Sequence, residues 1–317
     1  MADRPSTSAD VAVVVVNYDT RDHLRACLTT IRVEAPREVI VVDNASSDDS
    51  AGMVRAEFPE VMLHANTTNH GYGAAANQGI HACRASYVLL LNSDTRLQPG
   101  ALSAMGDYLD LHPRVAIAGP LLRNPDGTRQ PSCFPFLTPL NVLVLNTVLC
   151  ELVGFLPFLR GRFLPAWQHD SACAVPWVKG AALAIRREAF DAVGGFDESY
   201  FMYAEELDLC YRLGAAGWET HYAPVTSVTH VEGASTMQRR PEMLSRLFAS
   251  IGHFYRRHYP PAYRPRLRWA VTAVMWQRIL KDTIRFHLAR EPLLRRRYAS
   301  DLVVWRQIKE EHREGVR

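Results

Sequence analysis

The sequence predicts an α/β fold, in which a mostly parallel sheet carries helices on both faces and is followed by a basic helical extension. Two observations lead to this prediction. Short, strongly apolar runs alternate with amphipathic runs from residue 11 to about residue 118, and strands that are apolar on both sides are typical of buried parallel sheets. From residue 241 onward the pattern has only helical spacing and is rich in arginine.

The expected elements follow one another regularly in the first half of the chain. Strands are expected at residues 11–16, 38–42, 60–65, 87–91 and 115–118. Helices are expected at residues 20–31, 46–58 and 73–83, and at a segment that Pro99 opens in its first turn. After residue 124 the rhythm changes, with strands expected within residues 175–185, a helix at 203–215, and helices alone from 241 onward.

Charge divides the chain into parts. The 317 residues have a net charge of +3. From residue 237 to the end there are 19 Lys and Arg against 7 Asp and Glu, whereas the preceding residues hold 17 against 26. We therefore expect a disordered polar N-terminus at residues 1–9, a main domain at 10–236, and a basic helical region at 237–317 that contacts an anionic membrane surface or a second copy of the chain.

Apolar residues recur at helical spacing within the basic region. They are Trp269, Ala273, Trp276, Leu280 and Ile284. Arginines surround them, which is typical of a helix on a membrane surface, but the same spacing suits a helix that packs on the main domain.

A second apolar segment lies earlier, at residues 141–159. Because it contains Glu151 and Pro157, it is expected to be a buried or surface-lying helix rather than a membrane span. The six cysteines are scattered without metal-binding spacing, and the N-terminus shows no secretory leader. These features indicate a cytoplasmic protein with reduced thiols.

Polar residues directly follow the apolar strands. The run YVLLL ends in Asn92, Ser93 and Asp94, and the run EVIVV ends in Asp43. Such residues form turns readily, but the carboxyl ends of parallel strands are also where α/β proteins bind ligands. From the residues alone, Asp94 is either a turn residue or a metal ligand, and Asp43 is either a helix cap or a contact to a pyrimidine or ribose.

A glycine-rich run offers another kind of nucleotide site. Gly71, Gly73 and Ala76 match the pattern G-x-G-x-x-A, with Asp94 about 20 residues further on. This fingerprint of dinucleotide-binding proteins normally follows the first strand, whereas here it follows the third. We therefore expect no nicotinamide or flavin cofactor. Small residues at this place suit either a ligand at a helix N-terminus or tight packing of helix on sheet.

Five motifs, taken in order, resemble those of the family 2 glycosyltransferases, and most closely those of the rhamnosyltransferase-like branch. They are VVVVNYDT, VVDNASSDDS, NHGYGAAANQG, LLLNSD and GAALAIRREAFDAVGGFDESYFMYAEELDLCYR. The resemblance runs from about residue 11 to residue 230. It implies a GT-A fold, which is Rossmann-like, for residues 10–236. It also implies an inverting enzyme that uses a nucleotide-diphosphate sugar together with Mg²⁺ or Mn²⁺.

The resemblance also implies roles for single residues at the donor site. Asp43 would read the nucleotide, and Asn92 and Ser93 would contact the donor, with Asn92 in place of the first Asp of the family's DXD motif. The implied metal ligands are Asp94 and His230, although a lone histidine is more often structural. Further residues expected at the donor are Asn17, Tyr18, Asn69, Gly71, Asn77, Trp177, Lys179 and Gly180.

Inversion at a sugar carbon needs a carboxylate that takes the proton of the acceptor hydroxyl. In EELDLCYR the resemblance assigns this role to Glu206, where the family usually has Asp, with Glu205 as the alternative. Asp208 is expected to pair with Arg212, four residues further on. Trp177 is either the floor of the sugar pocket or a core residue.

The expected activity is transfer of a sugar such as rhamnose in the assembly of surface polysaccharide. The donor would be a dTDP- or UDP-sugar, and the acceptor a hydroxyl of a saccharide or of a polyprenyl-linked sugar. We expect the protein at the inner face of the cell membrane, without a nucleic-acid partner and with a homodimer as an open alternative.

Two other functions stay open: an inactive relative that binds nucleotide sugars, and a sugar nucleotidylyltransferase, whose basic glycine-rich loop is absent after Val16. Gln130 and Ser132 fall in a segment that the family places near the site, with no role that follows from the sequence.

Overall fold

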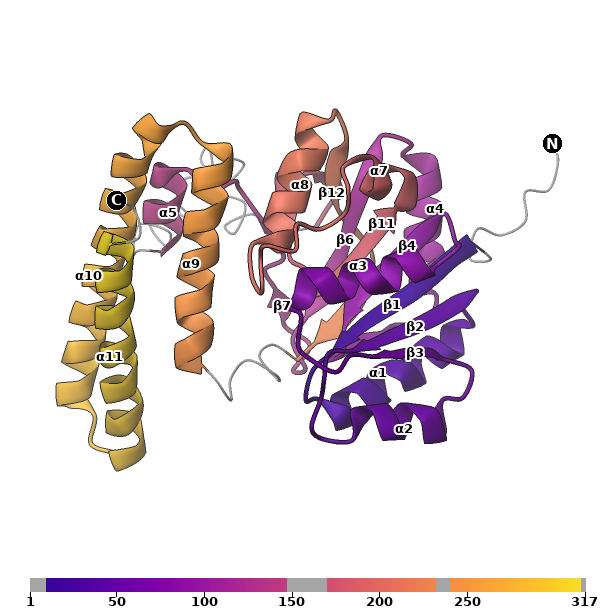
Figure 1. Cartoon of the computed structure of the whole chain (residues 1–317), viewed down its shortest axis with the longest axis horizontal. Helices are drawn as coiled ribbons and strands as arrows, with labels where there is room; N and C mark the ends of the chain where they lie inside the picture. The colour runs from indigo at the N-terminus through magenta and orange to yellow at the C-terminus, as the bar shows by residue number, and fades with distance from the viewer. Residues whose placement is uncertain (1–9, 147–169, 232–239, 315–317) are drawn as a thin grey trace. The chain divides into compact units, whose positions relative to one another are not determined.

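The chain forms two compact units. The computed structural model of the protein describes residues 10–146, 170–231 and 240–314. The first unit, which holds a large sheet, comprises residues 10–134, 170–201 and 205–231. The second unit, which is helical (Figure 1), comprises residues 135–146, 202–204 and 240–314. The disorder predicted for residues 1–9 concerns a segment outside the described residues.

The sheet of the first unit has the strand order β3-β2-β1-β4-β11-β6-β12-β5. Its strands are β1 (Val11–Asn17), β2 (Glu38–Asp43), β3 (Met62–Ala65), β4 (Tyr87–Asn92), β5 (Thr95–Leu97), β6 (Val115–Arg123), β11 (Ala182–Arg186) and β12 (Glu219–His230). The first four are parallel to one another, β6 is parallel to β12, and β11 is antiparallel between the two groups. The predicted mostly parallel α/β sheet is therefore confirmed.

Short strands extend the sheet or lie beside it. β7 (Arg129–Gln130) pairs with β6, and β9 (Cys173–Ala174) pairs with β12. β8 (Cys133–Phe134) and β10 (Trp177–Val178) form a separate antiparallel pair. The strands that the sequence predicted within residues 175–185 correspond to β10 and β11.

Helices cover both faces of the sheet, as predicted (Figure 1). They are α1 (Arg21–Glu34), α2 (Ser50–Glu57), α3 (Tyr72–Ala82), α4 (Ala101–Leu111), α7 (Arg187–Ala192) and α8 (Glu205–Ala215). On one face, Val13 and Val15 of β1 belong to the same buried cluster as Leu24 of α1. On the other face, Val14 lies so close to α3 that a Cβ on Gly79 would be 2.4 Å from its Cγ1. Both faces of β1 are thus buried, which explains why the strand is apolar at every position before its last.

Two differences from the predicted elements concern the carboxyl edge of the sheet. The helix expected at residues 46–58 begins only at Ser50, because residues 46–48 hydrogen-bond the loop that follows β1. The residues directly after Asp94 form β5, which the sequence did not predict. This strand pairs antiparallel with the end of β12 and brings Thr95 opposite His230.

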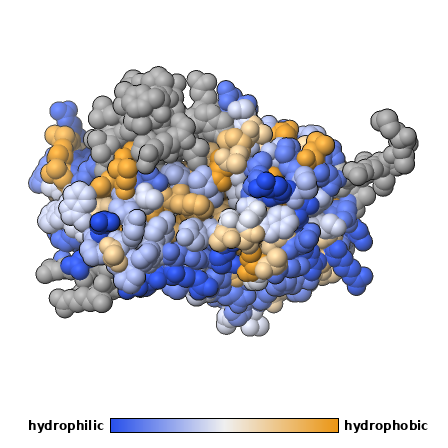
Figure 2. All heavy atoms as spheres, turned by 90° about the horizontal axis from the view of Figure 1, so that it is seen from above, coloured by the Kyte–Doolittle hydropathy of each residue, from blue (hydrophilic) through white to orange (hydrophobic). Residues whose placement is uncertain are grey.

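The second unit is built from long helices. Its elements are α5 (Pro139–Asn146), α9 (Arg240–His258), a short 3₁₀ helix η5 (Pro261–Tyr263), α10 (Arg264–Leu288) and α11 (Pro292–Glu314). α10 packs against α5 and α11, and α11 packs against α9. The left part of Figure 2 shows hydrophobic side chains lying among hydrophilic ones on the surface of this unit. The predicted helical extension is confirmed.

Two expectations for the apolar segment at 141–159 have different outcomes. Residues 135–146 were expected in the main domain, but they join the helical unit because α5 packs on α10 with Val142 and Val144 buried. Residues 147–159 lie outside the described part of the chain. Among the described residues, no helix is both long enough and apolar enough to span a membrane.

Candidate active site

The polar residues at the strand ends lie side by side. In the parallel register, Asn17 at the end of β1 is opposite Asp43 at the end of β2. Val16 is in turn opposite Asn92, the last residue of β4. Asp94 follows Asn92 by two positions, so the candidate nucleotide and metal residues share the carboxyl edge of the sheet, as predicted.

Asn17 and Asp43 bind each other at this edge. Asn17 Nδ2 donates to Asp43 Oδ2 at 2.8 Å, and the backbone N–H of Ser46 donates to Oδ1 at 3.0 Å. Asp43 is only 2% exposed, so its carboxylate holds the turn after β2, which is the structural alternative that the sequence left open. Tyr18, in the loop after β1, is half-buried. Contact of these residues with a nucleotide remains a prediction.

Ser93 and Asn92 are engaged differently. Ser93 Oγ lies 2.7 Å from Thr20 Oγ1, which donates to Asn17 Oδ1, also at 2.7 Å. Ser93 therefore ties the end of β4 to the loop after β1. The side chain of Asn92 is half-buried and forms no hydrogen bond to another of the described residues, so its amide is available to a ligand.

The glycine-rich run serves packing. Gly71 has a φ of 89°, and a Cβ there would lie 2.4 Å from the backbone oxygen of Phe201. Asn69 Oδ1 accepts from the backbone N–H of Gly71 at 2.9 Å. Asn77 uses both ends of its amide to hold residues 196–198. Tight packing, one of the two alternatives from the sequence, accounts for these residues, and their contacts to a donor remain predictions.

His230, the last residue of β12, faces Asp94. Its Nε2 lies 3.3 Å from Asp94 Oδ1, and its Nδ1 lies 2.7 Å from Gln130 Oε1. Gln130 Nε2 donates to Asn124 Oδ1 at 3.0 Å, which fixes the amide so that Oε1 is the acceptor and His230 Nδ1 carries the hydrogen. In the neutral ring, the Nε2 lone pair then faces a carboxylate oxygen. Two acceptors at this distance require a proton or a cation between them.

The pair of Asp94 and His230 therefore fits a divalent metal ion that is bound together with a diphosphate. Both side chains are buried, and Gln130 provides the hydrogen bond that a metal-binding histidine normally makes through its other nitrogen. In the part of the chain that the structure describes, no group of three or more His, Cys, Asp and Glu could hold a metal ion. A site with two protein ligands leaves positions for phosphate oxygens and water, which suits Mg²⁺ and Mn²⁺.

Two acids begin α8, of which Glu205 is buried and Glu206 is half-buried. Glu205 is 5% exposed, and Glu206 Oε1 accepts from the backbone N–H of Gly180 at 3.3 Å. Oε2 of each is buried without a hydrogen-bond partner among the described residues. Burial raises the pKa of both carboxyl groups, and the charge of Glu206 raises the pKa of Glu205 further. Buried acids with an unused oxygen oppose folding and are a mark of functional sites.

The chain enters α8 in a strained conformation. Tyr203 and Ala204, the two residues before Glu205, have φ values of 67° and 66°. Residues other than glycine in this left-handed region cost about 1–3 kcal/mol each and are enriched at active sites. These two strained residues directly precede the acids Glu205 and Glu206.

Tyr72, which the sequence analysis did not select, connects the acids with the metal pair. Its hydroxyl donates to the backbone oxygen of Gly180 at 3.0 Å. Burial raises the pKa of Tyr72 well above its usual value, and the charges of Glu205, Glu206 and Asp94 raise it further. Gly180 thus binds both Tyr72 and Glu206, and the backbone oxygen of the next residue, Ala181, accepts from the backbone N–H of Asn92 at 3.0 Å. These contacts bring the acids to the end of β4, where Asp94 follows. The available signal was an aromatic residue between the two glycines of GYG.

The residues predicted for the sugar pocket lie on and after β10. Trp177 stacks on Phe134 of β8, with ring centroids 4.8 Å apart. The backbone N–H of Lys179 donates to the backbone oxygen of Ser132 at 2.7 Å, and the charge of Lys179 lowers the pKa of Glu206 against the effect of burial. The structure thus brings Lys179 to the acids and places Trp177 in an aromatic pair. Trp177 is half-buried, and its contact with a sugar remains a prediction.

Asp208 has the structural role that the sequence predicts. It is fully buried and accepts from Arg212 Nε at 2.6 Å and from the Tyr200 hydroxyl at 3.3 Å. Arg212 also donates to the backbone oxygens of Val193 and Gly195. The pair therefore ties α8 to the turn after α7.

The change Asp208→Ala is expected to lower the free energy of unfolding by about 3 kcal/mol, because it leaves a half-buried guanidinium without its buried carboxylate. Urea denaturation measures this loss. The matched control is Asp191→Ala, which breaks a more exposed pair with Arg187 at 3.5 Å and should cost less than about 1 kcal/mol. Equal losses for the two variants would contradict the structural role.

Glu205→Gln is expected to stabilise the protein at neutral and higher pH. Because the pKa of Glu205 is raised on folding, the native state holds the proton more tightly than the unfolded chain. The protonated group contributes its full stability when the pH is below 4.5, its ordinary pKa. This contribution is lost as the pH rises toward the higher pKa of the folded state. Thermal unfolding over a pH series should therefore show a variant that gains on the wild type with rising pH. Glu188→Gln, at an exposed position, should show no such trend, and a pH-independent difference for Glu205→Gln would contradict the assignment.

Comparison with known proteins decides the family. The family model described as "Glycosyltransferase like family 2" matches residues 8–248. The chain belongs to glycosyltransferase family 2. It is 32% identical over 301 residues, or 90% of this chain and 94% of the relative, to N-acetylglucosaminyl-diphospho-decaprenol L-rhamnosyltransferase from Mycobacterium tuberculosis. It is 37% identical over 79 residues, or 25% of this chain and 30% of the relative, to rhamnosyltransferase WbbL from Escherichia coli. The predicted family and its rhamnosyltransferase-like branch are confirmed.

Solved structures confirm the fold of this glycosyltransferase. The mannosyltransferase PcManGT from Pyrobaculum calidifontis, in complex with GDP-Man and Mn²⁺, superposes with a TM-score of 0.54 at 17% identity and covers 98% of this chain and 90% of its own. GalNAc-T7 with UDP, GalNAc and Mn²⁺ has a TM-score of 0.56 at 14% identity, with coverage of 78% and 48%. At these identities the similarity concerns the fold alone, which is GT-A-like, as predicted.

Proposed function

We propose that this glycosyltransferase moves L-rhamnose from a dTDP- or UDP-linked donor to a hydroxyl of an N-acetylglucosamine carried on polyprenyl diphosphate. The relative from M. tuberculosis supports this choice of sugar and acceptor, because the similarity extends over nearly the whole length of both chains. Such a product would be an early intermediate of a cell-surface polysaccharide. Catalysis rests on the residues around Tyr72.

The environment of Gly180 carries the proposal. Its backbone N–H binds Glu206, its oxygen binds the Tyr72 hydroxyl, and the oxygen of the next residue binds the backbone N–H of Asn92, two positions before the carboxylate that faces His230. Sugar transfer with inversion needs these two components in one space: a base for the acceptor and a binding site for the charge of the donor diphosphate.

In the proposed mechanism, Glu206 takes the proton of the acceptor hydroxyl through Oε2 while the hydroxyl oxygen forms a bond to the anomeric carbon. The bond from this carbon to the diphosphate oxygen breaks on the opposite face, and the diphosphate keeps the electron pair, so that the configuration inverts. Gly180 holds Oε1 of Glu206 and leaves Oε2 unpaired. Burial and the charge of Glu206 raise the pKa of Glu205 well above the ordinary value, which favours Glu205 as the member of the pair that holds a proton and Glu206 as the member that ionises.

Lys179 favours the ionised form of Glu206 and thereby its action as a base. On the donor side, Asp94 and His230 would hold Mg²⁺ or Mn²⁺, which supplies positive charge to the departing diphosphate. Gln130 keeps the hydrogen of His230 on Nδ1, so that Nε2 remains free to bind. Asn92 offers its unengaged amide to the donor, and Asp43 would contact the nucleotide base or ribose.

A transfer assay with defined substrates tests this function. The purified chain is incubated with N-acetylglucosaminyl-diphospho-polyprenol and Mn²⁺, with dTDP-rhamnose, UDP-rhamnose, UDP-glucose or GDP-mannose as donor. Mass spectrometry should show one added deoxyhexose with a rhamnose donor and no transfer from the other two, and NMR should show an inverted anomeric centre. Transfer of another sugar would correct the donor, retention of configuration would exclude the single displacement, and nucleotide binding without any transfer would indicate an inactive relative.

A further inference from the structure

The helix α10 has two apolar sides. One side is buried within the helical unit and includes Ala270, Val271, Val274 and Met275. The other side is exposed, and its residues are Trp269 (66% exposed), Trp276 (56%), Leu280 (63%), Ile284 (50%) and Leu288 (75%). Their spacing of seven and then four residues places them on one face over five helical turns.

This exposed face is unusual for the protein. Of the fourteen large hydrophobic side chains that are exposed in the described part of the chain, nine lie between Tyr263 and Val303. Those outside the helical unit, such as Val33 and Val225, are distant from one another in sequence. Scattered apolar residues are normal on a protein surface, whereas a continuous apolar stripe marks an interaction surface.

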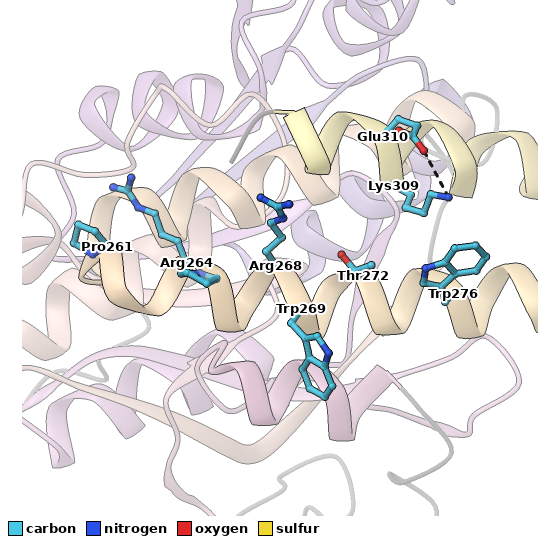
Figure 3. A pocket seen from close by; sticks show the side chains of 9 residues that line it. Pro261, Arg264, Arg268, Trp269, Thr272, Trp276, Lys309 and Glu310 are labelled. Atoms are coloured by element: carbon cyan, nitrogen blue, oxygen red, sulfur yellow. Dashed lines mark ion pairs between the residues drawn. The ribbon is translucent and has the colours of Figure 1, made fainter. Parts of the chain in front are cut away.

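A groove of about 650 Å³, lined by both apolar and basic side chains, lies beside the start of this stripe. Arg264, Arg268 and Thr272 enter it from successive turns of α10, and Lys309 enters it from α11 (Figure 3). Trp269 and Trp276 also line the groove, so the cationic groups and the apolar stripe are continuous with each other.

The groove has an excess of positive charge. Lys309 pairs with Glu310 at 3.6 Å and lies 4.4 Å from the centre of the Trp276 ring. Arg264 and Arg268, by contrast, have no ion-pair partner among the described residues, and Arg264 Nε is buried without a hydrogen-bond partner. Two unpaired guanidinium groups one turn apart, together with a hydroxyl, form a suitable binding site for a phosphate group.

We propose that α10 docks on an anionic phospholipid bilayer, with the stripe of Trp269, Trp276, Leu280 and Ile284 in the interface and a lipid phosphate between Arg264 and Arg268. A bilayer offers an apolar phase and a phosphate at neighbouring depths, as the stripe and the groove require, and tryptophan is favoured at such interfaces. Charge disfavours a second copy of the chain as the occupant, because α10 carries six basic residues and one acidic residue. This inference is independent of the sugar and the acceptor proposed above.

Vesicle co-sedimentation of the full chain tests the docking. Vesicles of phosphatidylcholine with and without phosphatidylglycerol are compared for the wild type, Arg264→Gln/Arg268→Gln and Leu280→Ser/Ile284→Ser. The matched control is Arg55→Gln/Arg84→Gln, which removes two exposed arginines of the sheet unit. Wild type and control should bind only the anionic vesicles. The double arginine variant should bind them about 30-fold more weakly, since each basic side chain near an anionic surface contributes roughly a factor of five.

The outcomes separate the lipid surface from other partners. All variants substitute solvent-facing or half-exposed residues, and equal melting temperatures show that each is folded. The proposal is overturned if the wild type binds both kinds of vesicle equally. It is also overturned if Arg264→Gln/Arg268→Gln and Leu280→Ser/Ile284→Ser bind anionic vesicles as the wild type does. The proposal is also wrong if inorganic phosphate raises the melting temperature while the protein binds no vesicles, because the groove would then be a site for a free anion. Sedimentation equilibrium provides the last measurement. If the wild type is a dimer that does not bind vesicles, and Leu280→Ser/Ile284→Ser is a monomer, the face belongs to a second copy of the chain and the proposal is wrong.

Discussion

Replacing Glu206 with glutamine is expected to lower kcat for sugar transfer by about 10²–10⁴-fold, the usual contribution of a general base. Glutamine keeps the size of the side chain and can still accept from the backbone N–H of Gly180 through its amide oxygen. It cannot take up the acceptor proton. Steady-state kinetics with saturating donor measures the loss, and calorimetric titration should show donor affinity unchanged within about twofold, since the proton transfer belongs to the transition state alone.

Glu205→Gln is the matched control for this experiment. Because Glu205 is expected to carry its proton in the native state, the amide resembles the native group and most of the activity should remain. If Glu205→Gln lowers kcat more than Glu206→Gln does, Glu205 is the base and Glu206 is the acid that keeps its proton. The wild type should also gain kcat as the pH rises through the pKa of Glu206, which lies above the ordinary value of 4.5, and Glu206→Gln should lack this dependence.

The edge of the sheet that carries the site could be predicted from the sequence because it depends on local patterns. An apolar strand that ends abruptly in polar residues fixes both the end of the strand and the layer in which the polar residues lie. This holds for Asn17, Asp43 and Asn92, which the parallel register places on adjacent strands. The motif resemblance added the assignment of the acids at the start of α8.

The roles of several site residues could not be predicted because their partners are distant in the chain. Gly71 is required by the backbone of Phe201, and Asn77 holds the backbone of Phe196. Tyr72 meets Gly180 in the same way. The local sequence shows that small or amide-bearing residues are present, but only the folded chain shows what approaches them.

The basic extension shows a similar limit. Helical spacing predicted that Trp269, Trp276 and Leu280 share one face of α10, and the structure agrees. The sequence could not decide whether this face is covered, because the answer depends on where α5 and α11 pack. Those helices cover the opposite side of α10, which contains Val271 and Val274.

The segment around Gln130 shows what a single long-range contact adds. No role for this residue followed from the sequence pattern, and it lies near a turn formed by Asn124 and Gly127. The pairing of β7 with β6, and of β6 with β12, brings it to His230. Its amide oxygen accepts a hydrogen bond from Nδ1 of the histidine. The nitrogen that carries no hydrogen is then Nε2, which faces Asp94.

Asp94→Ala is expected to lower metal-dependent transfer by about 10³-fold, because the diphosphate would leave without the positive charge that this carboxylate helps to hold. EDTA should inactivate the wild type to a similar extent, and added Mn²⁺ should restore it. Titration of Mn²⁺ in the presence of the nucleoside diphosphate, followed by electron paramagnetic resonance, measures the metal affinity directly. Full activity of Asp94→Ala, or of the wild type in EDTA, would exclude the metal site.

A series of variants that weaken the metal site to different degrees tests this prediction. Gln130→Ala leaves both proposed ligands in place but frees the His230 ring, so Mn²⁺ affinity should fall by about 10–100-fold, as for other partners of metal-binding histidines. Excess Mn²⁺ should rescue Gln130→Ala, whereas Asp94→Ala should stay inactive at every metal concentration. Glu219→Gln, which changes the partner of His221 on the same strand, is the control and should bind Mn²⁺ as the wild type does. If His230 instead serves only to hold the strand end, Gln130→Ala will lower the melting temperature without changing Mn²⁺ affinity. The two measurements on this one variant therefore separate a ligand from a structural histidine.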